Sequence, residues 1–197
     1  MKKKVNKKKR NIFLIVGIII VLSAVFIAVF CPVITKYDPI GVEVKDRITA
    51  PSVQHKLGTD EMGRDVLSRM FFGVRASMII GLSVAVLSTV AGIIVGVMAG
   101  YYKKVDNILM RILDGIMAFP SIIIAIALAG ILGTGKVNII IALSVAYFPT
   151  MARIVRSSVL SLREIEYVQS VKVVGASDAY IIIPVSYTHL RAHETRR

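Results

Sequence analysis

The chain has 197 residues, of which 55% are hydrophobic and 19% charged, and its mean hydropathy is +0.72. Soluble domains average about 45–50% apolar and about 25% charged residues, so this composition predicts a membrane protein and argues against a soluble enzyme. The formal net charge is +13, but seven basic residues lie within the first ten positions, so more than half of the excess belongs to one terminal segment. A single cysteine, Cys31, excludes an intramolecular disulfide.

Four apolar segments follow in chain order. The first, 11–35, has no charged residue and is long enough to cross a bilayer. It is too long for a secretory signal peptide, and we expect Pro32 to end its helix. A polar loop, 36–75, then carries seven basic and six acidic residues. The second span, 76–102, is again free of charge.

Three glycines recur every four residues in the second span, at Gly92, Gly96 and Gly100. This spacing places them on one face of a helix, where a second helix can approach closely. Glycine is also frequent in membrane helices in general, but the spacing favours a helix-packing face.

Prolines interrupt the two remaining apolar segments. The third, 108–132, contains Arg111 and Asp114, which are three residues apart, so they share a helical face and could pair. Both lie within the first two turns, and we expect them to reach the lipid headgroups. Pro120 is predicted to bend this span. After a Gly-Thr-Gly-Lys turn, the fourth span covers 137–152 and has its own bend at Pro149.

The distribution of Lys and Arg predicts the orientation of the spans. The basic N-terminus is expected in the cytoplasm, which places loop 36–75 outside and the Lys103–Lys104 pair inside. By the same alternation Lys136 lies outside. The basic residues that follow the fourth span lie inside: Arg153, Arg156 and Arg163.

A search for catalytic motifs is negative. The chain has three histidines, and no zinc-protease motif, Gly-rich phosphate loop or paired cysteine motif is present. His189 and His193 lie four apart beside Glu194, a spacing that fits a metal ligand pair on a helix, but we interpret it as coincidence in a polar tail. We therefore predict no catalytic residue, no metal site and no cofactor in this chain, and we do not expect an enzyme.

The cytoplasmic segment 161–183 has a helix–turn–helix pattern. Apolar and small residues at helical spacing precede Gly175, which suits a helix C-terminus, and Ser177 and Asp178 suit the next helix start. This segment reads either as an interfacial helix lying on the bilayer or as an element that docks into a soluble partner.

At this segment the chain resembles the permease subunits of binding-protein-dependent ABC importers, specifically the C-type subunit of the dipeptide, oligopeptide and nickel group. The family's loop signature, approximately E-A-A-x-x-x-G, corresponds here to Gln169–Gly175, QSVKVVG, with the Glu-Ala-Ala core replaced. Three further stretches carry the resemblance: LGTDEMGRDVLSRMFFGVR at 57–75, AFPS at 118–121 and VLSLREIEYV at 159–168.

The resemblance implies a fold, a function and a set of partners. The fold class is all-α, a polytopic membrane helix bundle with four spans of an expected six. The function implied is a transmembrane permease subunit for peptides, with nickel as an alternative cargo. Its location would be the bacterial or archaeal cytoplasmic membrane, with the N-terminus inside. The partners implied are a second permease subunit, two ATPase subunits that bind ATP and Mg, an extracytoplasmic substrate-binding protein and membrane lipid, without nucleic acid.

In such importers the cytoplasmic loop seats in a groove of the ATPase subunit and transmits its movement. By position, the residues that the resemblance assigns to this coupling are Glu166, Gln169, Ser170, Val171 and Gly175. The expected organisation is a basic tail with the first span (1–35), an extracytoplasmic loop (36–75), a partial permease domain (76–184) that contains the coupling loop (161–184), and a tail (185–197).

The tail departs from the family pattern. Family members continue with H-I-L-P-N and two more spans, whereas residues 185–197 are polar and contain two of the three histidines. We expect this tail to be foreign to the family and the chain to be truncated, with a naturally divergent tail as the alternative. Two other functions stay open: a small four-span scaffold or assembly protein with an interfacial helix, and a membrane-anchored protein that binds nucleic acid through its basic tail.

Overall fold

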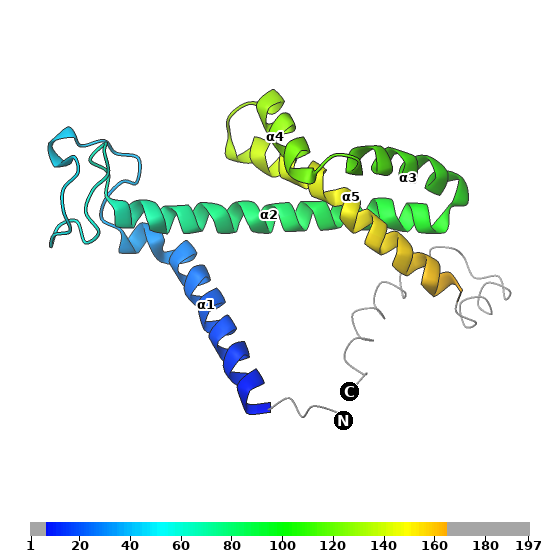
Figure 1. Cartoon of the computed structure of the whole chain (residues 1–197), viewed down its shortest axis with the longest axis horizontal. Coiled ribbons are helices and arrows are strands. Elements are labelled where there is room, and N and C mark those ends of the chain that lie inside the picture. Colours follow the sequence, from blue (N-terminus) through cyan, green and yellow to red (C-terminus); the bar gives the residue numbers. More distant parts are fainter. Residues whose placement is uncertain (1–6, 165–197) are drawn as a thin grey trace. The chain divides into compact units, whose positions relative to one another are not determined.

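A computed structural model describes residues 7–164 and shows a helical chain (Figure 1). Five α-helices follow one another: α1 (Lys7–Ile34), α2 (Val66–Tyr101), α3 (Lys103–Met117), α4 (Ser121–Leu132) and α5 (Lys136–Arg163), with one 3-10 turn, η1 (Val44–Asp46), in the loop after α1. The chain divides into two compact units, whose boundary after Leu82 falls inside α2. The all-α prediction is confirmed.

Three of these helices are long and apolar enough to cross a membrane: α1 from Ile12, α2 and α5. The bent pair α3 and α4 would make a fourth crossing if the two helices together form one span. Large apolar side chains cover the outside of α1, and none of the side chains in its most apolar window is buried. Lipid, rather than protein, satisfies such a surface in a multi-pass membrane protein.

Helix α1 continues past the proline that was expected to end it. Pro32 lies inside α1, which runs to Ile34, and Thr35 donates its backbone N–H to the Cys31 carbonyl at 3.0 Å. A proline near the end of a helix removes only its own N–H bond, and the turn that follows can still close. The prediction that Pro32 ends the helix is therefore wrong by two residues.

The polar loop is shorter than predicted because α2 begins at Val66, ten residues before the expected start of the second span. Asp65 directly precedes this helix, and its carboxylate accepts a hydrogen bond of 2.8 Å from the backbone N–H of Ser68. This is the geometry of a helix N-cap, which satisfies one of the free N–H groups of the first turn. Residues 66–75 are therefore helix and not loop.

The predicted third span is two helices and not one. The axes of α3 and α4 differ by 87°, with the break at residues 118–120. Pro120 immediately precedes α4, and its fixed φ suits the first turn of a new helix better than the interior of an old one. Pro149 behaves differently, because it is fully buried and α5 continues through it.

Helix α4 turns back along α5 through a short connection, and these two helices lie side by side (Figure 1). Gly133 and Gly135 in this turn have φ of 83° and 153°. Residues with a side chain rarely adopt such values, so the tight return depends on glycine at both positions.

Candidate functional site

Helices α2 and α5 approach each other at three glycines of α2, in the order Gly92, Gly96 and Gly100. A Cβ added to the first would lie 2.5 Å from the Cβ of Met151, one on the second 2.6 Å from the Ala152 carbonyl oxygen, and one on the third 2.7 Å from the Cβ of Val159. Carbon atoms in contact normally lie about 3.5–4.0 Å apart. The two backbones therefore lie closer than any side chain at these positions would allow, and we call this contact the glycine seam.

The order of contacts along the glycine seam gives the relative direction of the two helices. Moving along α2 from Gly92 to Gly100, the neighbours on α5 advance from Met151 to Val159. Both helices therefore run in the same direction, and their C-terminal ends lie on the same side. When both cross a membrane, the intervening segment α3–α4 must carry the chain back across it. This requirement supports counting the bent pair as one crossing.

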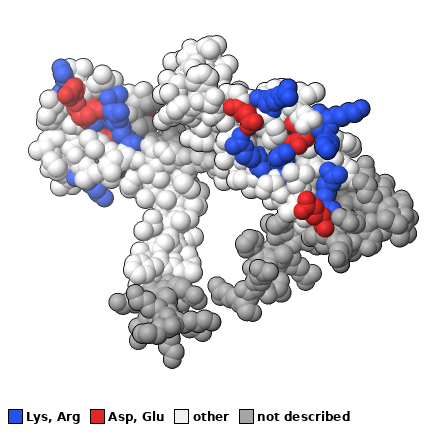
Figure 2. All heavy atoms as spheres, turned by 45° about the vertical axis from the view of Figure 1, so that its right-hand side comes forward, with Lys and Arg blue, Asp and Glu red and all other residues white. Residues whose placement is uncertain are grey.

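Two aspartates of α3 form ion pairs with arginines of α5. The Arg156 guanidinium donates two hydrogen bonds to the Asp106 carboxylate, one from Nε to Oδ1 and one from Nη2 to Oδ2, the latter at 2.6 Å. Arg153 Nη2 lies 2.5 Å from Asp114 Oδ1, in a pair whose side chains are about half exposed. The two parallel hydrogen bonds between Arg156 and Asp106 fix the relative orientation of the two side chains in addition to pairing their charges. In Figure 2 blue and red atoms gather in patches on a surface that is otherwise mostly white.

Arg163 ties the end of α5 to the end of α2. Its Nη1 donates hydrogen bonds to the carbonyls of Gly100 at 2.8 Å and Tyr101 at 3.0 Å, and its guanidinium lies 5.3 Å from the centre of the Tyr101 ring. The last carbonyls of a helix have no partner inside the helix and carry partial negative charge. The Arg163 guanidinium supplies hydrogen-bond donors to these carbonyls and a positive charge next to their partial negative charge.

The loop before α2 is organised around a buried carboxylate and a buried histidine. His55 Nδ1 lies 3.1 Å from Asp65 Oδ1, and the His55 ring stacks against Tyr37 with centroids 4.6 Å apart. Burial alone raises the pKa of Asp65, but hydrogen bonds from the Ser68 backbone and from His55 outweigh it and lower the pKa below its ordinary value. Asp65 is therefore charged at neutral pH, and it joins the loop to the first turn of α2.

Asp60 is the second fixed carboxylate of this loop. It accepts backbone N–H bonds from Met62 at 2.8 Å and Arg64 at 3.0 Å, and the guanidinium groups of Arg64 and Arg69 also contact it. Partial burial acts to raise its pKa, yet these four donors together hold the pKa of Asp60 well below its usual range. A chain reversal at Gly63, whose φ is 74°, allows both sides of the turn to reach this carboxylate.

Comparison with known proteins identifies the second half of the chain. Residues 88–187 match the model of the binding-protein-dependent transport system inner membrane component family. This range contains the glycine seam and the arginine pairs, and it covers half of the chain. The chain belongs to this family.

Curated relatives extend the match over most of the chain. It is 44% identical over 167 residues to the "Putative peptide transport system permease protein" of Brucella suis biovar 1, which covers 85% of this chain and 56% of that protein. A dipeptide transport system permease protein of Alkalihalophilus pseudofirmus is 38% identical over 88% of this chain and 58% of its own length. A nickel transport system permease protein of Escherichia coli is 34% identical over 75% of this chain and 53% of its own length. The chain thus spans a little over half the length of these relatives.

The residues expected to form the coupling loop of this family member lie outside the described residues: Glu166, Gln169, Ser170, Val171 and Gly175. The three glycines of the expected helix-packing face lie at the glycine seam, and Pro120 lies at the break between α3 and α4. Between residues 7 and 164, no group of three or more His, Cys, Asp and Glu side chains is placed to hold a metal ion.

Asp114 does not take Arg111, the basic residue on its own helical face, as its ion-pair partner. Asp114 contacts Arg153 of α5 instead, because α3 lies against α5 and offers its carboxylate a partner on a different helix. Sequence reasoning also missed the pairs Arg156–Asp106 and His55–Asp65. The two residues lie 50 positions apart in the first pair and ten in the second, and neither separation is a helical spacing of three or four residues.

Proposed function

We propose that this chain acts as a transmembrane permease subunit of an ATP-driven ABC importer and forms part of its translocation pathway. The observation that carries the proposal is the family match over residues 88–187, which includes three helices joined by the glycine seam and the arginine pairs. A small membrane scaffold has no comparable support, since the match extends over these elements in chain order.

The proposed cargo is a peptide, of the dipeptide or oligopeptide class. Relatives named for peptide and dipeptide transport are 44% and 38% identical to the chain, whereas the nickel-named relative is 34% identical. A relative named for oligopeptide transport, from Bacillus subtilis, is 36% identical over 88% of the chain. The relatives with the higher identities are thus named for peptide transport, which favours a peptide as the cargo.

The proposed orientation places the N-terminus and the C-terminal ends of α2 and α5 in the cytoplasm. The parallel arrangement of α2 and α5 supports it, because it brings the Lys103–Lys104 pair to the same end as Arg156 and Arg163. Basic residues concentrate on the cytoplasmic side of membrane proteins. Loop 36–65 then lies outside, where the proposed substrate-binding protein delivers its cargo.

The proposed coupling element follows α5 directly. On this view Glu166, Gln169, Ser170, Val171 and Gly175 contact an ATPase subunit that binds ATP and Mg, and a second permease subunit completes the pathway. Arg163, the last residue of α5, donates hydrogen bonds to carbonyls of α2, so α5 is joined to α2 at the point after which this element is expected to begin. The chain itself hydrolyses nothing in this scheme.

Reconstitution tests the proposal. The full chain would be co-expressed with the second permease subunit, the ATPase subunits and the binding protein of the proposed importer and purified through a tag on this chain. The complex would be placed in proteoliposomes, with ATP on the side that the ATPase subunits face. We expect uptake of a radiolabelled dipeptide that depends on ATP and on the binding protein. Failure of the ATPase subunits to co-purify, or ATP-independent binding without uptake, contradicts the proposed function.

A variant separates coupling from assembly. Gly175→Val is expected to leave ATP hydrolysis in place and to abolish uptake. The sequence predicts a helix C-terminus at Gly175, and a β-branched residue is disfavoured in the left-handed conformation with which helices commonly end. Gly115→Val serves as the matched control, since a Cβ at Gly115 meets no atom within 4 Å. Normal uptake by the Gly175→Val complex would contradict the assigned coupling role.

A further inference from the structure

The loop between α1 and α2 carries large aliphatic side chains on its outside. Four of them lie on two segments, 42–48 and 60–63, and each exposes more than half of its surface: Val42 (58%), Val44 (70%), Ile48 (72%) and Met62 (52%). We call these four residues the aliphatic patch. A single exposed aliphatic residue is ordinary, but a group of them at one place on a polar loop marks an interaction surface.

Backbone contacts hold the two segments against each other. The Ile48 N–H donates a hydrogen bond to the Asp60 carbonyl at 3.2 Å. Gly63 lies so close to the Glu43 carbonyl oxygen that no Cβ would fit between them. Every residue of the aliphatic patch makes one of these contacts or directly neighbours a residue that does. The four side chains therefore project from one compact piece of the loop.

The inside of this piece of the loop is polar. Asp60 accepts hydrogen bonds from the backbone N–H groups of Met62 and Arg64, and the guanidinium groups of Arg64 and Arg69 also contact it. Polar groups thus hold the two segments together, while the aliphatic side chains lie on the outside. The aliphatic patch is kept in place without contributing its own burial to folding.

Ile48 has a backbone conformation that opposes stability. Its φ is 51°, and among the described residues it is the one residue other than glycine with a positive φ. A β-branched residue strongly disfavours this region, where glycine or asparagine is normally found. Since the Ile48 side chain is 72% exposed, packing within the loop does not offset the strain. A strained and exposed aliphatic side chain indicates contact with another molecule.

Lipid does not reach the aliphatic patch in the proposed orientation. With 36 residues, α2 is about 54 Å long, whereas a bilayer with its headgroups is about 40–45 Å thick. The uncharged stretch 76–102 covers about 40 Å and ends at the cytoplasmic Lys103, so the N-terminal part of α2 projects outside. The loop joins this projecting part at Val66, and Arg69 there pairs with Asp60. The aliphatic patch therefore faces water beyond the headgroups.

The surroundings of the aliphatic patch fit a protein that binds and is released. Exposed charges of both signs border it, from Glu43, Lys45, Arg47 and Glu61. An apolar centre with a polar rim is the usual anatomy of a protein interface. Four side chains are too few for the interface of permanent subunits, which buries about 2,000 Å² or more. They suit a transient partner.

We propose that the aliphatic patch is a docking point for the extracytoplasmic substrate-binding protein. This inference rests on the proposed function and adds the surface of this chain that the binding protein contacts. The four aliphatic side chains pack against an apolar area of the binding protein, and the charged rim restricts its orientation. Because few side chains are buried, the binding protein can leave after it has delivered its cargo.

The test measures docking on the assembled complex. This chain, the second permease subunit and the ATPase subunits are placed in lipid nanodiscs and immobilised, and the affinity of the soluble binding protein is measured by biolayer interferometry. Replacing three patch residues together (Val44→Ser, Ile48→Asn and Met62→Ser) is expected to weaken docking about a hundredfold or more, since each buried aliphatic side chain contributes about tenfold.

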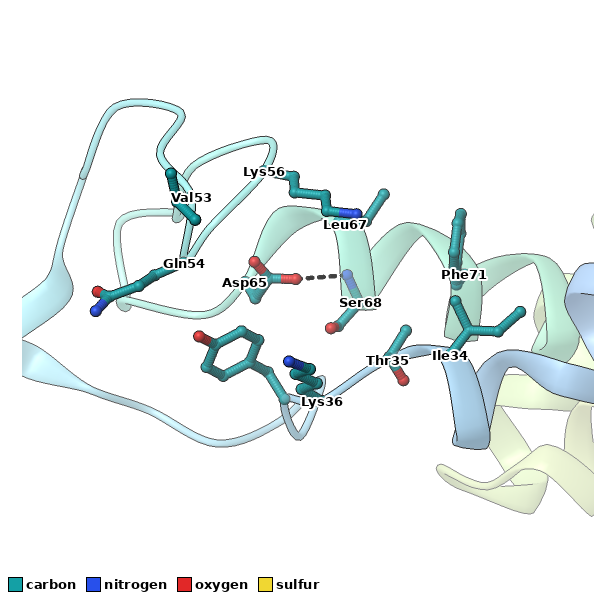
Figure 3. Close-up of a pocket in the computed structure, with 11 residues that line it drawn as sticks. Ile34, Thr35, Lys36, Val53, Gln54, Lys56, Asp65, Leu67, Ser68 and Phe71 are labelled. Carbon is teal, nitrogen blue, oxygen red and sulfur yellow. Dashed lines mark hydrogen bonds between the residues drawn. The ribbon is translucent and has the colours of Figure 1, made fainter.

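Ile48→Asn alone separates docking from folding. Asparagine adopts a positive φ more readily than isoleucine, so this variant should resist heat and trypsin as well as the unchanged chain or better. Its docking affinity is nevertheless expected to fall about tenfold. The matched control is Val53→Ser, which removes an exposed aliphatic side chain outside the two segments, beside a hollow of about 420 Å³ (Figure 3), and should keep the affinity.

Two results on the complex would overturn the docking role and leave the proposed function in place. One is an unchanged affinity in the triple variant, or an equal loss in Val53→Ser. The other is loss of the second permease subunit from the triple-variant complex, which would assign the aliphatic patch to subunit assembly. Failure of the ATPase subunits to co-purify with the unchanged chain would instead refute the proposed function, and the docking role with it.

A fluorescent probe distinguishes the remaining occupants. The chain has no tryptophan, so Val44→Trp in the full chain alone reports on the aliphatic patch. In vesicles we expect no quenching by brominated acyl chains and a blue shift when the binding protein is added. Quenching by the brominated lipid would assign the patch to the membrane. A shift that depends on the number of chains per vesicle, before any binding protein is added, would assign it to a second copy. Either result overturns the proposal.

Discussion

The two ends of α2 are held by opposite means. Its N-terminal end depends on polar side chains, with Asp65 joining the first turn to His55 of the loop. Its C-terminal half depends on missing side chains, because the glycine seam brings its backbone against α5. An atom added at the glycine seam would clash with α5, whereas an atom removed from the Asp65 carboxylate would break a hydrogen bond at the N-terminal end. The following predictions test this contrast from the largest expected effect to the smallest.

The largest effect is expected for Gly96→Val. The new Cβ would meet the Ala152 carbonyl oxygen and the Val155 side chain, and backbone atoms cannot move aside without separating the helices. We expect a loss of about 3 kcal/mol or more of stability, at or beyond the upper range of overpacking. Fluorescence-detected size-exclusion chromatography after graded heating measures it.

The control for this substitution lies on the same helix. A Cβ at Gly81 meets no atom within 4 Å, so Gly81→Val should leave the melting curve unchanged within error. Equal losses from Gly81→Val and Gly96→Val would show that the glycine seam has no special role.

Removal of the carboxylate at the other end of α2 should have the next largest effect. Asp65→Ala leaves the Ser68 N–H without its cap and His55 without its partner, at a cost of about 2–3 kcal/mol. We expect faster trypsin cleavage within loop 36–65 and little change at α5. Glu61→Ala, a change at an exposed carboxylate, is the comparison, and cleavage as fast in this variant would argue against a special role for Asp65.

The two arginine pairs should differ in strength. The Arg156 and Asp106 side chains are 28% and 15% exposed, whereas those of Arg153 and Asp114 are 49% and 61% exposed. We expect Arg156→Gln to cost about 1–2 kcal/mol and Arg153→Gln less than about 1 kcal/mol, since exposed pairs are screened. Double-mutant cycles with Asp106→Asn and Asp114→Asn measure each coupling, and a reversed order would contradict this ranking.

The smallest effect is expected from pH, and only below the ordinary aspartate pKa of 3.8. Asp60 and Asp65 have lowered pKa values in the folded loop, so their contribution is complete above about pH 4 and is lost as the pH falls further. Hydrogen–deuterium exchange of loop 36–65 should stay constant from pH 7 to 5 and rise below pH 4, after correction for intrinsic rates. A rise that begins between pH 7 and 5 would contradict the assignment to these two carboxylates.

Sequence reasoning was most successful where a feature repeats locally. Runs of apolar residues predicted the helical membrane class, and the period of four identified the glycines that meet α5. It was wrong where one side chain decides a boundary, as when Asp65 starts α2 ten residues early. It could not foresee the pairing of Asp106 with Arg156, because that contact exists only after α3 and α5 are placed together.

The glycine seam also restricts how α5 can move along α2. Its glycines recur every four residues, about 6 Å along the helix axis, and the α5 residues opposite them, Met151, Val155 and Val159, recur with the same interval. A shift by less than a full interval would press a side chain onto a residue that has a Cβ. A shift by a full interval would bring Met151 opposite Ser88 or Val159 opposite Lys104, and both of these residues have a Cβ. The three glycines therefore fit α5 at a single position along α2.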